Sequence, residues 1–394
     1  MSNESPFFLT KVECPICKTL NEFETIKVGA YVENGRDTDF CPLEIQWRFH
    51  RYQAYHPLVY FTATCSNCFY TREFTNNYKE WKNDNNFRTY RLKTIKAKHL
   101  DQLATADSVI KRMGEAIDIG RYPNESAILK SHLAVMDESM SDHPSKLDLG
   151  RFYLRIAWIF RSLQQGGNAN NQFLNGLMLE LDSKYLTLDR TFHEVSDELT
   201  RFTAHLMSHF DNDDVSTDIK ARILPFKEQF EAALQEFNTG HADGEQKLQE
   251  ILSLIGDYKA TALGTDGTDG TAAFGSYPSF LDFLLQLKKD NAGITLNERE
   301  AMEKAIKFYI EALQDGRTIA PGNQQLQATY LIAELSRRIG DYDGAKQYFN
   351  ATIKYGQEFI YQNRQDQSRT ALARKILELA IEQGKTNLAA LQTA

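Results

Sequence analysis

The sequence predicts a mainly α-helical protein, built from helical repeats with a long helical hairpin inserted among them and a small β-rich module in front. Three observations lead to this prediction. The 394 residues include only nine prolines and 22 glycines, too few turn residues for an all-β chain of this length. All five cysteines lie within the first 68 residues. From about residue 95 to the end, apolar residues recur at spacings of three and four.

Composition and charge narrow the class of protein. Hydrophobic residues make up 42% and charged residues 25%, which is typical of soluble globular proteins, and no segment approaches the ~18 apolar residues of a membrane-spanning helix. The first residues, MSNESPFFLTKVECP, lack the basic and apolar regions of a secretory signal, so we expect a cytoplasmic protein with no membrane contact. Residues 1–100 contain 14 Lys and Arg against 11 Asp and Glu, whereas the remainder contains 31 against 42. The acidity therefore belongs to the predicted helices.

Residues 1–75 are predicted to form a metal module of the zinc-ribbon type. Cys14-Pro-Ile-Cys17 and Cys65-Ser-Asn-Cys68 are two CxxC motifs, a spacing that lets both thiolates of each pair face one ion. Four thiolates from two such turns close a tetrahedral shell, so we predict one structural Zn²⁺. Runs rich in β-branched and aromatic residues predict strands around the motifs, at Lys11–Glu13, Glu22–Glu33 and Leu58–Thr64.

Alternative roles for the cysteines are open. Disulfides require an oxidising compartment, a redox CxxC normally opens a helix in a βαβ unit, and a catalytic zinc keeps an open position beside His or carboxylate ligands. Cys41 is expected to be a buried apolar residue, with a role as metal ligand or reactive thiol as its alternative. His50 and His56 would be accessory ligands if one cysteine did not bind, although packing or surface histidines explain them more simply.

Residues 76–98 are predicted to form a basic, aromatic connector. The stretch 72–98 holds eight Lys and Arg against three acids, interleaved with five aromatic residues. Cations for phosphate and rings for base stacking are features of single-strand binding, and Lys93, Lys96 and Trp81 are the candidate nucleic-acid contacts. The alternative is an amphipathic connector whose rings pack on neighbouring structure while its lysines are solvated.

A helical domain at 99–260 is predicted to contain the long hairpin. Apolar residues from Leu188 to Leu206 step alternately by four and three, and similar stripes follow the acidic residues 211–214. This heptad pattern predicts long antiparallel helices with a kink near Pro225. The small residues and glycines of 261–279 cannot bury a core and predict a flexible linker.

Residues 280–394 are predicted to form TPR-like helices. Gly340 separates two helical stretches whose small and aromatic residues follow TPR spacing, with Ala333 before the turn and Ala345 and Phe349 after it. Two degenerate pairs are predicted as well: Pro278–Lys288 with the helix of Ala305, Tyr309 and Ala312, and the helix of Ala157, Trp158 and Phe160 with Phe173–Leu181. Three such units are enough for a stack to bury its faces.

The order and spacing of these motifs resemble an uncharacterised bacterial family, a domain of unknown function, in which a two-CxxC zinc-ribbon-like region precedes TPR-like helices. The matching residues are the two CxxC motifs, Phe23, Arg36, Asp39-Phe40, Pro57, Tyr60, Tyr70 and Ala157-Trp158-Ile159-Phe160-Arg161. That family commonly has a glycine after the second cysteine of each motif, where Lys18 and Phe69 stand here. The resemblance implies that Asp39 and Tyr60 brace the ribbon, behind the ligands or in its packing.

No enzyme motif accompanies these features, since the sequence has no phosphate-binding loop, nucleophile elbow, HExxH or dinucleotide fingerprint. We therefore predict a non-enzymatic, zinc-stabilised scaffold that binds a protein or peptide partner in the groove of its TPR-like helices. One alternative is a nucleic-acid-associated zinc-ribbon protein. Another is a zinc-dependent hydrolase, which would need non-cysteine ligands and an open coordination position.

Overall fold

The computed structural model describes residues 5–49, 52, 55–165, 169–210, 214–262, 274–316 and 319–393. The chain divides into two compact units: unit 1 comprises Met1–Gln164 with Ala273–Ala394, and unit 2 is Gln165–Ala272. His50, the acidic residues 211–213 and residues 263–273 of the predicted linker lie outside the described residues. The domain boundaries expected from composition stay predictions.

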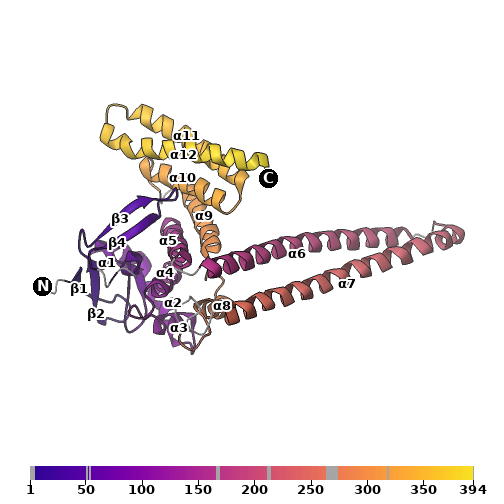
Figure 1. Ribbon diagram of the computed structural model, residues 1–394, viewed down its shortest axis with the longest axis horizontal. Helices are drawn as coiled ribbons and strands as arrows, with labels where there is room; N and C mark the ends of the chain where they lie inside the picture. The colour runs from indigo at the N-terminus through magenta and orange to yellow at the C-terminus, as the bar shows by residue number, and fades with distance from the viewer. Residues whose placement is uncertain are drawn as a thin grey trace. The chain divides into compact units, whose positions relative to one another are not determined.

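Short strands at the start of unit 1 form three separate antiparallel hairpins (Figure 1). They are β1 (Phe7–Glu13) with β2 (Leu20–Ile26), β3 (Tyr31–Arg36) with β4 (Pro42–Trp47), and β5 (Thr62–Thr64) with β6 (Thr71–Glu73). Glu13 faces Leu20 and Thr64 faces Thr71 across their ladders. Each CxxC motif therefore forms the turn of a hairpin, as a zinc ribbon requires.

The structure corrects two of the predicted strands. A turn whose Gly29 has a φ of 74° divides Glu22–Glu33 into β2 and β3. Pro57–Tyr60 forms a 3₁₀ helix, η2, instead of the start of a strand. Pro57 suits the first turn of a helix, and His56 Nδ1 accepts a hydrogen bond from the Leu58 N–H at 3.2 Å. These capping interactions outweigh the β-branched and aromatic composition of the segment.

Helices make up most of the rest of unit 1, as predicted. They are α1 (Asn76–Lys79), a π-helical turn η3 (Phe87–Arg91), α2 (Leu92–Ala104), α3 (Val109–Glu115), α4 (Pro123–Ser139), α5 (Lys146–Gln165), α8 (Phe280–Asp290), α9 (Glu298–Asp315), α10 (Asn323–Arg338), α11 (Tyr342–Gln362) and α12 (Gln367–Thr393). Helix α4 is buried around most of its circumference and contacts β5, β6, η2, α2 and α3. It is the element on which the β5–β6 hairpin, η2 and helices α2 and α3 pack together. Among the described residues, no helix is long and apolar enough to cross a membrane.

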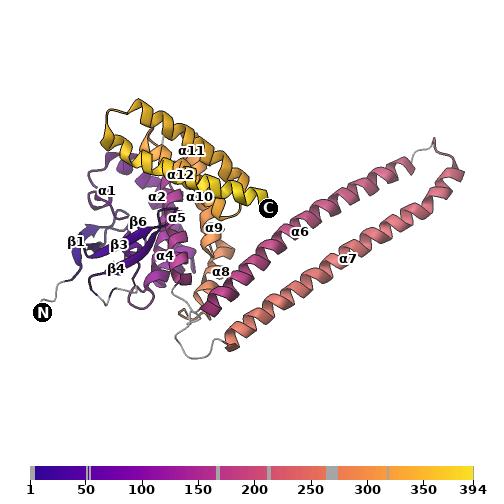
Figure 2. The same cartoon turned by 45° about the horizontal axis from the view of Figure 1, so that its top comes forward.

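Helices α9 to α12 pack consecutively, and α10 also contacts α12 (Figure 2). Gly340, with a φ of 85°, lies in the left-handed turn that follows the end of α10. The Asp341 side chain then caps α11 by accepting a hydrogen bond from the Gly344 N–H at 3.0 Å. Ala345 and Phe349 are buried in the core that these helices share. The helix-turn-helix predicted around Gly340 is therefore confirmed.

Unit 2 is the predicted hairpin of long helices, α6 (Ala169–Phe210) and α7 (Thr217–Ala262), which contact each other. Phe192 stacks on Phe237 with ring centroids 4.5 Å apart, and Phe202 contacts Phe230 at 5.5 Å. The heptad positions therefore meet across the hairpin. Pro225 lies inside α7, and the helix continues on both sides of it.

One predicted helix pair is wrong. The sequence spacing joined the helix of Trp158 to Phe173–Leu181 as one repeat. In the structure, Trp158 lies on α5 in unit 1, whereas Phe173–Leu181 lies near the start of the 42-residue α6 in unit 2. The apolar run belongs to one continuous long helix, and periodicity alone does not show where such a helix begins.

A buried ion-pair network joins the β3–β4 hairpin to the helices of unit 1. The Asp39 side chain is fully buried, and Arg161 of α5 donates two hydrogen bonds to its carboxylate, at 2.7 and 3.1 Å. Trp158 Nε1 donates a third at 3.2 Å. Arg161 also donates to Asp37 at 3.0 Å and to Glu298 of α9 at 2.8 Å. Asp39 thus binds the β3–β4 hairpin to α5. Asp39, Trp158 and Arg161, three of the residues on which the family resemblance rests, contact one another in this network.

Replacement of Asp39 tests this network. We expect Asp39→Ala to lower the free energy of unfolding by about 3–5 kcal/mol, because it leaves part of the charge of Arg161 buried and unpaired. Glu33 provides the matched control, since its pair with Arg36 on the same hairpin is solvent-accessible, and we expect Glu33→Ala to cost less than about 1 kcal/mol. Urea denaturation measures both, and equal losses would contradict the assignment.

Candidate metal centre

The four cysteines of the CxxC motifs meet at one point. Their Sγ atoms all lie within 4.8 Å of one another. The Cys14 and Cys68 sulfurs are 3.6 Å apart, and the Cys17 and Cys65 sulfurs are 3.5 Å apart. A disulfide needs about 2.05 Å, and all five cysteines are free. Tetrahedral zinc at about 2.3 Å from each sulfur places the sulfurs about 3.8 Å apart, so the donor set fits one zinc ion.

The two knuckles share one backbone design. The N–H of Cys14 donates to the Thr19 carbonyl, and the N–H of Cys65 donates to the Tyr70 carbonyl, each at 2.9 Å. Lys18 and Phe69, which follow the second cysteines, have φ values of 67° and 62°. Both adopt the left-handed conformation that glycine usually supplies, at a cost of about 1 kcal/mol each. The missing glycines therefore do not change the turn.

Packing holds Phe69 in this conformation. A Cβ atom added to Gly114 of α3 would lie 2.1 Å from the Phe69 ring, so the ring rests directly on the glycine backbone. Asn21 supports the same knuckle from the other hairpin: its Nδ2 lies 3.5 Å from Cys65 Sγ, and its Oδ1 accepts a hydrogen bond from the Ser66 N–H at 2.9 Å. The second knuckle is therefore fixed by contacts from both sides.

A buried His99–Asp137 pair lies behind Cys68. His99 Nε2 is 2.8 Å from the Cys68 carbonyl oxygen, and Nδ1 is 2.6 Å from Asp137 Oδ1. Burial acts to lower the pKa of His99, but the Asp137 carboxylate outweighs it and the net shift is upward. The protonated ring can donate to both oxygens at once. Sequence reasoning missed this pair, although His99 stands four residues after buried Ile95 and hence on the inward face of α2.

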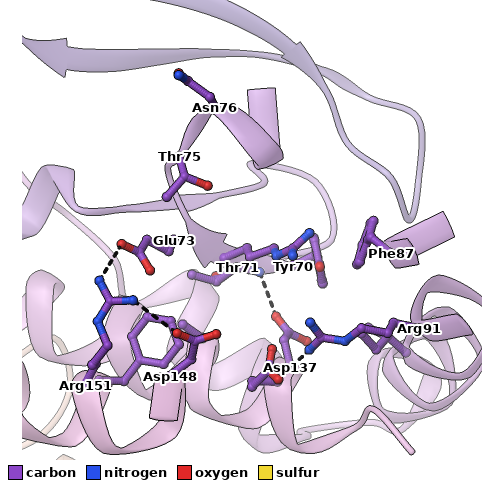
Figure 3. A pocket seen from close by; sticks show the side chains of 15 residues that line it. Tyr70, Thr71, Glu73, Thr75, Asn76, Phe87, Arg91, Asp137, Asp148 and Arg151 are labelled. Carbon is purple, nitrogen blue, oxygen red and sulfur yellow. Dashed lines mark hydrogen bonds and ion pairs between the residues drawn. The ribbon is translucent and has the colours of Figure 1, made fainter. Parts of the chain in front are cut away.

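A cavity of about 460 Å³ adjoins this pair (Figure 3). The second oxygen of Asp137 accepts the Thr71 N–H at 2.7 Å, which ties β6 to α4. Arg151 of α5 donates to Glu73 at 3.3 Å and to Asp148 at 3.1 Å. Arg91 pairs with Glu138 on the other side of the cavity. Through Thr71 and Glu73, strand β6, which follows the second knuckle, is therefore joined to α4 and α5. The same charged side chains make the lining of the cavity polar.

The ionisation of each cysteine thiol depends strongly on whether its three neighbours are protonated. Four thiolates within 4.8 Å repel one another, so they cannot all ionise without a cation. Hydrogen bonds from Cys14 and Cys68 lower the pKa of Cys65, and the interaction with Cys65 raises the pKa of Cys14 to about 12. Metal binding must therefore displace protons, and the affinity must rise with pH.

Three other candidates lie away from the four sulfurs. Cys41 is buried in the β3–β4 turn, where burial raises the pKa of its thiol to about 12 and disfavours the reactive thiolate. His56 caps η2, and burial lowers its pKa to about 4. Tyr60 packs on Phe7 with ring centroids 4.4 Å apart, so its contacts are with the aromatic cluster of the β-hairpins.

The candidate nucleic-acid contacts differ in their exposure to solvent. Trp81 is buried, and its Nε1 donates to the Glu13 carbonyl at 2.7 Å. Its ring therefore packs on the first hairpin and is not a platform for a base. Lys93 is exposed and Lys96 half-buried on α2. This placement agrees with the amphipathic-connector interpretation.

Comparison with known proteins extends these observations. A family model described as "Uncharacterized protein conserved in bacteria (DUF2225)" matches residues 7–224 and 282–375, which include the four cysteines and the Asp39 network. No curated protein and no solved structure matches the chain.

Substitution of single cysteines tests the donor set. We expect one zinc per chain in the purified protein, loss of that zinc in Cys65→Ser, and retention in Cys41→Ser, because only Cys65 belongs to the four-sulfur cluster. Elemental analysis by mass spectrometry measures the ratio. Equal zinc in the two variants would contradict the assignment.

The His99–Asp137 pair predicts a second effect. His99→Ala removes the support of the Cys68 carbonyl, and we expect about tenfold faster zinc release to a chromogenic chelator. His205→Ala, at an exposed position of α6, is the control and should release zinc at the wild-type rate. Identical rates in all three proteins would show that the pair does not act on the metal site.

Proposed function

The chain belongs to this family of uncharacterised conserved bacterial proteins, and we propose that it is a non-enzymatic scaffold that one structural zinc ion stabilises and that binds a protein or peptide partner through its C-terminal helices. Family membership supplies no activity. The proposal therefore rests on the chemistry of the metal centre and on the surface of the helices.

The donor set supports a structural role for zinc. A catalytic zinc keeps one position for water or substrate, whereas four sulfurs complete a tetrahedral shell. Cys14, Cys65 and Cys68 are fully buried, which further restricts access by a substrate. The ion would join the β1–β2 hairpin to the β5–β6 hairpin. Two-stranded hairpins are marginally stable alone, so metal binding would supply much of their folding free energy.

An apolar groove between α11 and α12 is the observation that carries the partner-binding role. It encloses about 790 Å³ and is lined by Ile360, Tyr361, Leu377 and Ile381. Tyr361 is 70% exposed and Ile381 39% exposed. An exposed apolar groove of this kind favours a further helix that packs there. Charged residues surround it, at Arg364, Arg374, Glu378, Glu382 and Lys385.

An amphipathic helix is the partner segment that suits this groove. Its apolar side chains, three and four residues apart, would pack between α11 and α12, and its polar side chains would meet the charged rim. The nucleic-acid alternative is weaker, because buried Trp81 offers no stacking surface. The hydrolase alternative is weaker because the four sulfurs leave no open position for water.

A pair of tyrosine variants tests the partner site. Tyr361→Asp places a charge in the groove, and Tyr90→Asp is the matched control because Tyr90 is 72% exposed on η3, away from the groove. In the natural host, we expect a partner protein to cross-link equally to the wild type and to Tyr90→Asp. Its cross-linking yield should fall at least tenfold with Tyr361→Asp, because that variant buries a charge in an apolar contact. Unequal melting temperatures would expose a folding defect, and equal cross-linking of both variants would overturn the proposal.

A further inference from the structure

A second cavity of unit 1 lies away from the metal centre and from the α11–α12 groove. It encloses about 470 Å³ between the β3–β4 hairpin and helices α5, α9 and α10. Its apolar lining includes Phe40, Leu154, Trp158 and Leu331. This volume lies within the range of pockets that hold small organic ligands, and the lining combines apolar with charged side chains.

Arg155 of α5 lines this cavity as a cation without a counter-ion. Within the part of the chain that the structure describes, its guanidinium has no hydrogen bond and no ion pair. It lies over the Phe61 ring, 3.6 Å from the ring centroid. Burial, reinforced by the charge of Arg151, lowers the pKa of Arg155 to about 10. Arg155 is half-buried and has no counter-ion among the described residues, so its guanidinium can pair with an anion that enters the cavity.

Tyr309 of α9 supplies a second free polar group. The residue is 3% exposed and lines the cavity, and the described residues give its hydroxyl no hydrogen-bond partner. Burial raises the pKa of Tyr309 to about 12, and the charge of Arg155, which lines the same cavity, acts in the opposite direction. Gly150 makes room for the tyrosine, since an added Cβ would lie 3.3 Å from the ring. The Tyr309 hydroxyl is therefore able to donate a hydrogen bond to a ligand that enters the cavity.

The charges around the cavity favour a negative ligand. Its described lining contains three arginines against one carboxylate, Glu33. Arg36 is paired with Glu33 at 2.9 Å, and Arg151 is paired with Glu73 and Asp148. Arg155 is therefore the cation of this lining that remains free to bind a ligand.

We propose that this cavity binds a small ligand that carries a carboxylate or a phosphate on an apolar body. The oxyanion accepts hydrogen bonds from the Arg155 guanidinium and the Tyr309 hydroxyl. The planar guanidinium matches both anions in a two-point contact. The apolar body packs against Trp158 and its aliphatic neighbours. The proposal does not depend on the scaffold function, because it concerns a different part of unit 1.

Calorimetric titration of the full-length, zinc-containing protein tests this site. The probes are phenyl phosphate, phenylacetate and the neutral alcohol 2-phenylethanol, at constant ionic strength. We expect saturable binding of at least one anion and much weaker binding of the alcohol. Tighter binding of phenyl phosphate would identify a phosphorylated ligand, and tighter binding of phenylacetate would identify a carboxylic acid.

Variants assign the binding groups. We expect Arg155→Met to weaken anion binding about tenfold or more and Tyr309→Phe to weaken it several-fold, as loss of a charged hydrogen bond and of a neutral one predict. Arg299→Met is the control, because Arg299 is an exposed arginine of α9 paired with Glu303, and it should bind as the wild type does. The melting temperature of Arg155→Met should stay close to that of the wild type, since Arg155 is half-buried and makes no ion pair within the described residues. Arg155→Lys keeps the charge without the planar fork and serves if the methionine variant does not fold.

Three results would overturn the proposal. They are the absence of saturable binding of either anion, equal affinity of the wild type and Arg155→Met, and binding of the alcohol as tight as that of the anions. A lower melting temperature of Arg155→Met with unchanged anion affinity would assign Arg155 a purely structural role on the Phe61 ring.

Discussion

Four sulfur atoms held within 4.8 Å of one another require either shared protons or a cation, and the β-rich part of the molecule depends on this requirement. The hairpins β1–β2 and β5–β6 share no ladder with each other. Their knuckles meet at the cysteines and at the contacts of Asn21 with the second knuckle. A cation at this point would replace the repulsion between thiolates by four strong bonds. It would also join two elements that are too small to be stable alone.

Buried polar contacts attach the second knuckle of this centre to the helices. Cys68 is supported by His99 of α2, His99 by Asp137 of α4, and Asp137 also holds the first residue of β6. The middle hairpin is held differently, because Asp39 in its turn is bound by Arg161 and Trp158 of α5. Three separate hairpins are thus positioned on one helical core by the four-cysteine cluster and by buried ion pairs, without a common sheet.

Local sequence patterns predicted the parts of the structure that depend on local interactions. CxxC spacing predicts a turn of four residues, and heptad spacing predicts an apolar contact between the two long helices, where Phe192 and Phe237 stack. The strand predicted at Leu58–Thr64 is wrong in its first part, Leu58–Tyr60, because a cap and a proline, which act within three residues, outweighed composition. Pairs of residues far apart in the chain could not be predicted from local patterns: His99 and Asp137 are 38 residues apart, and Arg161 and Asp39 are 122 apart. The free guanidinium of Arg155 was not readable either, since only the fold shows which arginines have found carboxylates.

X-ray absorption at the zinc edge of the purified full-length protein tests the central claim most directly. A structural site of four cysteines predicts a single shell of four sulfurs at about 2.3 Å, with no nitrogen or oxygen neighbour. A shell that contains nitrogen or oxygen, or a folded protein without stoichiometric zinc, would contradict this account of how the hairpins are held together.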